Sequence, residues 1–117
     1  SRAFVAALLR SGVTRLIFSS TAAVYGEPAE SPVAESVPLL PINPYGRSKM
    51  MTEMMLEDAS RALGLSYGAL RYFNVAGADP QGRSGQCTPN ATHLIKVACQ
   101  AALGQRPFLQ VFGTDYD

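Results

Sequence analysis

The residues Arg15-Leu16-Ile17-Phe18-Ser19-Ser20-Thr21 combine a short apolar run with three consecutive hydroxyl side chains. An apolar run of this length predicts a buried strand of a parallel sheet. Hydroxyl residues are common where the carboxyl end of such a strand lines a site. We therefore expect the chemistry of this protein to lie at the end of this strand.

Elements of alternating type extend in both directions from this strand. The apolar residues of 4–9 repeat at helical spacing, which predicts a helix that contains Ser1 and ends at Ser11-Gly12. In the other direction the sequence predicts a proline-rich loop (26–44), a helix (44–63) with an inner stripe of Met51, Met55, Ala59 and Ala62, a strand (67–73), a loop (76–90), a helix (93–103) and a strand (109–112). This order is typical of a parallel α/β sheet.

Composition and charge exclude several classes of partner. Only 16% of the 117 residues are charged, against about 25% in an ordinary domain, while 47% are hydrophobic. We therefore expect a segment that packs against more protein. The net charge of +1 gives no basic surface for nucleic acid or for a membrane. The longest apolar run, Ala3–Leu9, is far shorter than the roughly 20 residues of a membrane span, so a cytoplasmic location is expected.

Tyr45 and Lys49 lie four residues apart at the start of the long helix, hence on one face about a turn apart. A phenol is a poor base at neutral pH, but a nearby ammonium, or an oxidised nicotinamide ring, favours the phenolate. The alternative interpretation is a solvated helix face, because this spacing often arises by chance. The hydroxyl cluster Ser19–Thr21 favours function, since it can converge with the pair at one end of the sheet.

Three motifs resemble, in this order, those of the extended short-chain dehydrogenase/reductase family. Within that family the similarity is greatest to enzymes that epimerise UDP-glucose at C4, and it continues through His93-Leu94-Ile95 and 111–116 to cover essentially the whole chain. The motifs are Ser19-Ser20-Thr21-Ala22-Ala23-Val24-Tyr25-Gly26, Pro44-Tyr45-Gly46-Arg47-Ser48-Lys49 and Leu70-Arg71-Tyr72-Phe73-Asn74-Val75-Ala76-Gly77-Ala78.

The resemblance implies part of a doubly wound, Rossmann-like α/β domain that lacks its N-terminal strands. Residues 1–75 would form the C-terminal half of an NAD-binding domain, and residues 76–117 the start of a nucleotide-sugar-binding region. The ten glycines never give Gly-x-Gly-x-x-Gly, so the turn that binds the pyrophosphate is expected before Ser1, and Asp117 is expected to be a cut. The fragment alone should therefore be inactive.

The resemblance also implies roles for individual side chains, and no metal site. Thr21 would hydrogen-bond the sugar 4-hydroxyl, Tyr45 would be the acid and base, and Lys49 would favour the phenolate while binding the nicotinamide ribose. The remaining cofactor contacts would be Ser19, Ser20, Tyr72 and Phe73, and the remaining substrate contacts Asn74, His93, Leu94, Gln110, Val111 and Phe112.

Two alanines distinguish the expected activity from dehydration of the sugar. Dehydratases of the family carry an acidic pair after the threonine, where Ala22-Ala23 stand here. The resemblance therefore implies interconversion of UDP-glucose and UDP-galactose by transient oxidation at C4 with tightly bound NAD, within galactose metabolism, by a homodimer. The alternatives are an NAD-dependent epimerase of uronate or N-acetylhexosamine nucleotides, or a non-catalytic dinucleotide-binding protein on the same fold.

Overall fold

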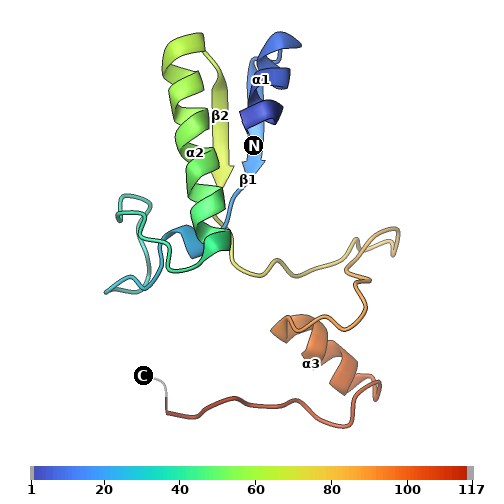
Figure 1. Ribbon diagram of the computed structural model, residues 1–117. Helices are drawn as coiled ribbons and strands as arrows, with labels where there is room; N and C mark the ends of the chain where they lie inside the picture. Colours follow the sequence, from blue (N-terminus) through green and yellow to red (C-terminus); the bar gives the residue numbers. More distant parts are fainter. Residues whose placement is uncertain (1, 116–117) are drawn as a thin grey trace. The chain divides into compact units, whose positions relative to one another are not determined.

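The computed structural model describes residues 2–115, so Ser1, Tyr116 and Asp117 and the expectations about them lie outside the described residues. The chain divides into two compact units between Phe73 and Asn74. The first unit contains α1 (Arg2–Arg10), β1 (Arg15–Ser19), the 3-10 turn η1 (Ala22–Val24), α2 (Pro44–Leu63) and β2 (Ser66–Leu70), and the second contains α3 (Leu94–Ala102) (Figure 1).

The strands β1 and β2 pair in parallel, with Arg15 opposite Ser66 and Ser19 opposite Leu70. Parallel strands need a crossover between them, and α2 supplies it. This confirms the predicted α/β class. The strand predicted over 67–73 ends earlier, at Leu70. Beyond it the Tyr72 carbonyl accepts a hydrogen bond from the Ala22 amide, at 3.0 Å, and so leaves the ladder.

The ends of α2 follow from local chemistry and confirm the predicted bounds. The Asn43 side chain accepts a hydrogen bond from the Gly46 amide at 2.8 Å, and Pro44 occupies the first turn, where no amide proton is needed. At the other end Gly64 adopts a left-handed conformation, with φ of 71°, and its amide donates to the Ser60 carbonyl.

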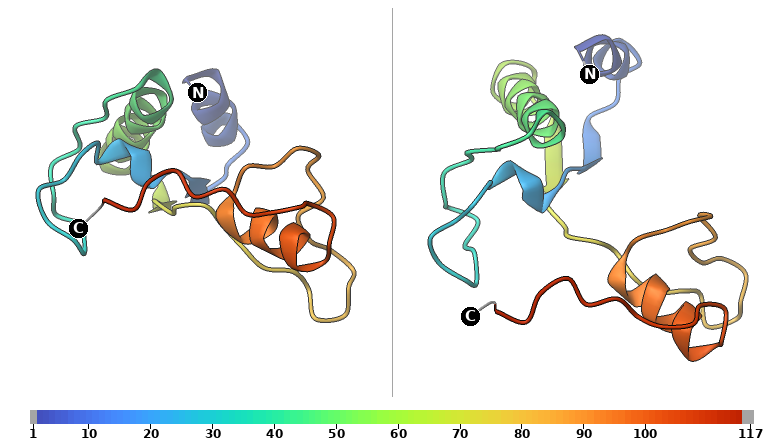
Figure 2. Two further views of the ribbon diagram at one scale, coloured as in Figure 1. Left: turned by 90° about the horizontal axis from the view of Figure 1, so that it is seen from below. Right: turned by 60° about the horizontal axis from the view of Figure 1, so that its bottom comes forward.

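Both α1 and α2 cover the same face of the sheet (Figure 2). The core between them consists of Val5, Leu56, Ala59 and Leu65, with Leu9, Leu16, Phe18 and Tyr67 packed against it. The opposite face is open, and Ile17 is 69% exposed.

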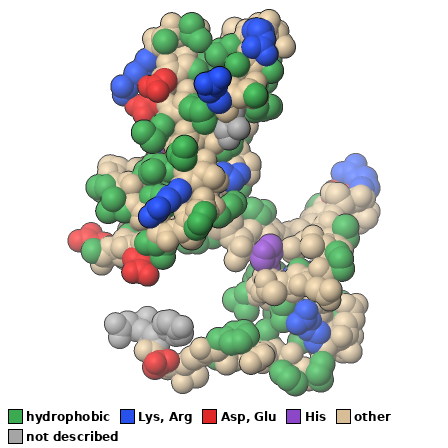
Figure 3. Space-filling view, viewed as in Figure 1, with side chains coloured by type: hydrophobic (Ala, Val, Ile, Leu, Met, Phe, Trp, Pro, Cys, Tyr) green, Lys and Arg blue, Asp and Glu red, His purple; other side chains and the backbone are tan. Residues whose placement is uncertain are grey.

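The predicted inner stripe of α2 is wrong at three of its four positions. Ala59 is buried, but Met51 and Ala62 are exposed and Met55 is only partly covered. Figure 3 shows hydrophobic side chains on the outer surface of α1 and α2, interspersed with Lys, Arg, Asp and Glu side chains. The residues that α2 buries are Gly46, Thr52, Glu53, Leu56 and Ala59. The methionines were predicted from apolar character alone, whereas the buried face of α2 includes Glu53, whose charge is paired with Arg71.

The second unit is built around α3. The helix predicted over 93–103 begins one residue later and ends one residue earlier, with His93 at its N-cap. The strand predicted over 109–112 is wrong, because no segment within 2–115 pairs with it. A strand is stabilised by its ladder, and without a partner this apolar segment is left exposed.

Close backbone approaches hold the loop between η1 and α2. At Gly26, which has φ of 71°, a Cβ atom would lie 2.1 Å from the Leu40 carbonyl oxygen. At Gly46 a Cβ atom would lie 2.5 Å from the Ala23 carbonyl oxygen. The loop therefore leaves η1 and returns to it, and the first turn of α2 packs directly on η1.

Gly46→Ala should destabilise a protein that carries this chain by about 1–3 kcal/mol, because the added methyl group overlaps a backbone oxygen that cannot rotate away. Thermal unfolding measures the loss. Gly68→Ala is the matched control, since its Cβ would meet only the flexible end of Ile17, at 3.3 Å. Equal melting temperatures for the Gly46→Ala variant and the wild type would contradict the close approach.

Candidate functional site

The turn that follows β1 presents the predicted hydroxyl cluster. The Thr21 side chain caps η1, where its oxygen accepts a hydrogen bond from the Ala23 amide at 3.2 Å. This contact uses a lone pair of the oxygen, so the hydroxyl proton is free to be donated. Thr21 is 9% exposed, and η1 packs on the first turn of α2, which carries Tyr45.

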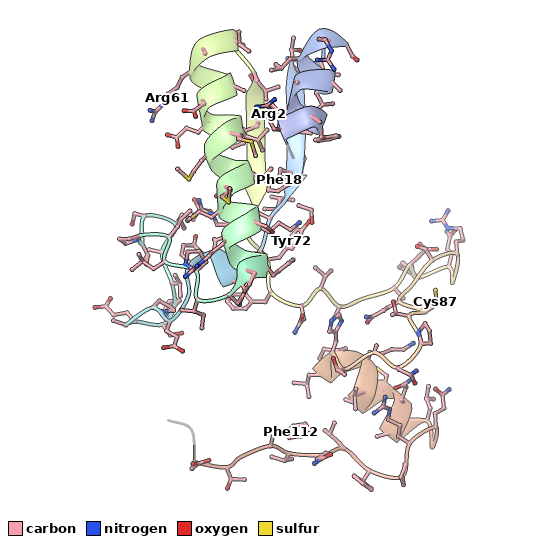
Figure 4. All side chains as sticks on the ribbon, viewed as in Figure 1. Arg2, Phe18, Arg61, Tyr72, Cys87 and Phe112 are labelled. Carbon is pink, nitrogen blue, oxygen red and sulfur yellow. The ribbon has the colours of Figure 1, made fainter. Side chains whose placement is uncertain are left out.

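Lys49 connects α2 to the carboxyl end of β1. Its ammonium donates a hydrogen bond to the Ser19 carbonyl at 2.8 Å and lies 5.2 Å from the centre of the Phe18 ring. It also lies 5.7 Å from the centre of the Tyr45 ring. The structure thus brings together the predicted residues Ser19, Tyr45 and Lys49. Figure 4 shows Phe18 and Tyr72 at this same end of the strands.

The Tyr45 side chain is 56% exposed, so its phenol is open to a small molecule. Tyr72 and Phe73 are both exposed just beyond β2. The Tyr72 backbone is fixed by its hydrogen bond to Ala22. The side chains predicted to border a cofactor therefore follow the two strands at their carboxyl ends, as the topology of a parallel sheet requires.

A buried polar network, which the sequence analysis missed, lies behind this end of the sheet. Ser20 is 2% exposed, and its hydroxyl donates to a carboxylate oxygen of Glu53, which is 5% exposed. Arg71 binds the same carboxylate through two nitrogens, Nε at 3.0 Å and Nη2 at 2.6 Å, and donates to the Tyr25 hydroxyl at 3.0 Å. The hydrogen bond to Glu53 raises the pKa of Arg71 above its usual value, so this guanidinium stays charged.

One signal in the sequence could have revealed this network. Tyr45, Lys49 and Glu53 follow one another at intervals of four, so they share a face of α2. If the acidic residue on this face is buried, it needs a cation nearby. Arg71 and Tyr25 lie within two of the three motifs, but the sequence analysis gave neither residue a role.

The other predicted substrate residues belong to the second unit. His93 Nδ1 lies 2.9 Å from Gln86 Nε2, and the Lys96 ammonium donates to the Gln86 carbonyl at 2.7 Å. The roles given to these residues stay predictions. Asn74 begins the unit, Leu94 is exposed in the first turn of α3, and Gln110, Val111 and Phe112 form an exposed, extended segment.

The donor set of the first unit fits the nicotinamide ribose end of NAD. The Lys49 ammonium has three N–H donors and uses one of them in the hydrogen bond to the Ser19 carbonyl. Two donors are left for the hydroxyl groups of a ribose. The chain has no glycine-rich turn for a pyrophosphate. Within 2–115, no group of three or more His, Cys, Asp or Glu side chains is placed to hold a metal ion, and no helix is long and apolar enough to cross a membrane.

The sequence and the fold are similar to those of known proteins. The family model described as the NAD dependent epimerase/dehydratase family matches residues 1–115. The UDP-glucose 4-epimerase of Azospirillum brasilense is 64% identical over all 117 residues, which are 34% of its length.

Two solved structures are similar over nearly the whole chain. The UDP-glucose 4-epimerase of Brucella ovis in complex with NAD is 44% identical, with a TM-score of 0.89 over 99% of this chain and 36% of that one. The Stenotrophomonas maltophila enzyme with bound NAD and formylated UDP-arabinopyranose is 38% identical, with a TM-score of 0.86 over 96% of this chain and 34% of that one. The chain thus spans about a third of the length of these relatives.

Proposed function

Because this chain belongs to the NAD dependent epimerase/dehydratase family, we propose that it is the catalytic segment of an enzyme that interconverts UDP-glucose and UDP-galactose with bound NAD. The observation that carries the proposal is the Lys49 ammonium, which contacts both the Ser19 carbonyl and the Tyr45 ring. The names of the similar proteins give the sugar nucleotide. Below, the full-length enzyme means a protein of the relatives' length that contains these residues.

The chemistry proposed for this site is a reversible proton transfer at the sugar 4-hydroxyl. The Tyr45 phenolate takes the hydroxyl proton as C4 is oxidised and returns it when C4 is reduced. The positive charge of Lys49 favours the phenolate, and Thr21 hydrogen-bonds the same sugar hydroxyl. Bound NAD supplies the acceptor, and later the donor, for the two electrons and the hydrogen of C4. Return of the hydrogen to the other face of the 4-keto sugar inverts C4.

The turn η1 supports epimerisation over dehydration. Ala22 and Ala23 form its first two residues, directly after the Thr21 cap. Neither side chain can protonate a leaving hydroxyl or remove a proton from C5. The oxidised sugar therefore has one productive outcome, which is reduction back to a 4-hydroxyl.

Further parts of the proposal concern the wider protein. We assign NAD and catalysis to residues 1–75, with Ser19, Tyr72 and Phe73 as cofactor contacts, and nucleotide-sugar binding to residues 76–117; the buried Ser20, also predicted as a cofactor contact, donates its hydroxyl to Glu53 instead. We place the enzyme in the cytoplasm as a homodimer. The substrate contacts proposed in the second segment are His93, Leu94, Gln110, Val111 and Phe112, with Asn74 on the diphosphate.

The experiment that tests this function is an assay of the full-length enzyme with UDP-galactose and no added cofactor. We expect UDP-glucose to form while absorbance at the NADH wavelength stays flat, because NAD is regenerated in every cycle. Parallel assays with UDP-N-acetylglucosamine and UDP-glucuronate address the alternative epimerases. Release of a 4-keto-6-deoxy sugar, or absence of conversion with every nucleotide sugar, would contradict the proposal.

Lys49→Met should lower turnover of the full-length enzyme, because it removes the ammonium that lies 5.7 Å from the centre of the Tyr45 ring and donates to the Ser19 carbonyl. The measurement is kcat for UDP-galactose across pH 6–10. Arg47→Met is the matched control, since it removes a cation from the same helical turn. A Lys49→Met profile that overlays the wild type would show that Lys49 and Tyr45 are uncoupled.

A further inference from the structure

A buried carboxylate lies directly behind the residues to which the chemistry is assigned. Glu53 stands one turn after Lys49 on α2 and is 5% exposed. Its carboxylate accepts a hydrogen bond from the Ser20 hydroxyl. Ser20 lies between Ser19, whose carbonyl holds the Lys49 ammonium, and Thr21, whose hydroxyl is proposed to contact the sugar. A single side chain on α2 thus holds the residue between two functional groups.

The carboxylate is itself held from several elements. Arg71, directly after β2, binds it through Nε and Nη2, and the Tyr25 hydroxyl at the end of η1 accepts a hydrogen bond from the same guanidinium. The guanidinium also lies 5.2 Å from the centre of the Tyr25 ring. A paired, buried carboxylate cannot move without separating two charges. It is therefore a rigid acceptor, and hydrogen bonds to ionised acceptors are the stronger kind.

We propose that Glu53 and Ser20 are positioning residues that fix the 19–21 turn against α2. This rests on the proposed function, since it concerns the same site. Rotation of the Ser20 backbone would move the Ser19 carbonyl and the Thr21 hydroxyl together, because each is one residue away. A displacement of about 1 Å in such a site can cost about 100-fold in rate. The hydrogen bond between Ser20 and Glu53 opposes that rotation.

The test uses Ser20→Ala in the full-length enzyme, because this change removes the hydrogen bond and leaves the pair of Glu53 and Arg71 intact. Ser11→Ala is its control, since the Ser11 hydroxyl donates to the Ala7 carbonyl far from β1's carboxyl end. Glu53→Gln is a second variant, with Glu57→Gln as control on the same helix, where Glu57 pairs with Arg61 at the surface. The measurements are kcat per bound NAD, KM for UDP-galactose, melting temperature, and amide exchange at Ala22 and Ala23.

We expect Ser20→Ala to lower kcat per bound NAD at least about 10-fold, with KM within about threefold, and to speed amide exchange at Ala22 and Ala23. Glu53→Gln should act in the same direction, and both controls should match the wild type. A purely structural role would lower the melting temperature and the amount of loaded enzyme but leave kcat per bound NAD unchanged, and that result would overturn the proposal. If Ser20→Ala does not fold, Glu53→Gln decides by the same measurements.

The two proposals fail in different ways. A wild type that converts no nucleotide sugar defeats the proposed function, and amide exchange then decides the positioning role by itself. Faster exchange at Ala22 and Ala23 in Ser20→Ala, and not in Ser11→Ala, supports it. Unchanged exchange overturns it.

Discussion

Tyr45→Phe in the full-length enzyme is expected to lower turnover at least about 100-fold, the usual effect of removing a general base. The side chain is 56% exposed, so the added loss of packing is small, and the ring that lies near Lys49 is retained. Binding of the UDP sugar should stay within a few-fold. The measurements are kcat by conversion of UDP-galactose, and affinity by calorimetry, so that chemistry and binding are separated.

Tyr67→Phe is the matched control, because it removes a phenol from the same unit but outside the site. Burial first, and then the charges of Glu57 and Glu53, raise the pKa of Tyr67, so its hydroxyl stays protonated and cannot act as a base. Turnover of this control should match the wild type. A Tyr45→Phe enzyme with turnover within threefold of the wild type would assign the proton transfer to another group.

The second large effect concerns these 117 residues expressed by themselves, which are expected neither to retain NAD nor to turn over UDP-galactose. Their two-stranded sheet is covered on one face only, and a pair of strands is marginally stable in water. Ile17 is exposed on the open face, and both strands present unpaired backbone groups. Such edges and apolar patches favour aggregation.

The checks on the isolated chain are its solubility, amide NMR line widths and melting curve with and without NAD. Broad signals, or precipitation, and a melting curve that NAD does not shift are expected. The absence of a glycine-rich phosphate turn from the sequence gives a second, independent reason for weak binding. A soluble monomer with a cooperative transition that NAD moves upward would contradict this prediction.

Local rules predicted the bounds of the secondary structure well. The Asn43-Pro44 start and the Gly64 end of α2, and the start of β1 at Arg15, follow from capping and from a short apolar run, which depend on neighbours in sequence. The contact of Lys49 with Tyr45 was predictable for the same reason, since both lie on one helical face.

Features that depend on distant residues were not predictable in this way. The buried face of α2 includes Glu53, which pairs with Arg71, eighteen residues away, whereas Met51, predicted to face inward from its apolar character alone, is exposed. The strand expected over 109–112 has the right composition, but a strand forms only where another is available to pair. The link from Lys49 to the Ser19 carbonyl joins residues thirty positions apart, and the sequence suggested only that they converge.

The loop from Gly26 to Asn43 leaves η1 and comes back to it, pinned by the contacts of Gly26 with Leu40 and of Gly46 with Ala23. Because these two contacts hold the ends of the loop, a change in the length of the loop should leave the geometry of η1 and of the start of α2 unchanged. Lengthening a flexible loop costs little, about 0.6 kcal/mol for each doubling. The exposed stretch around Glu30 is thus a suitable place for a peptide insertion, whether natural or engineered. Such an insertion could alter which molecules reach the site, while the start of α2 stays packed on η1.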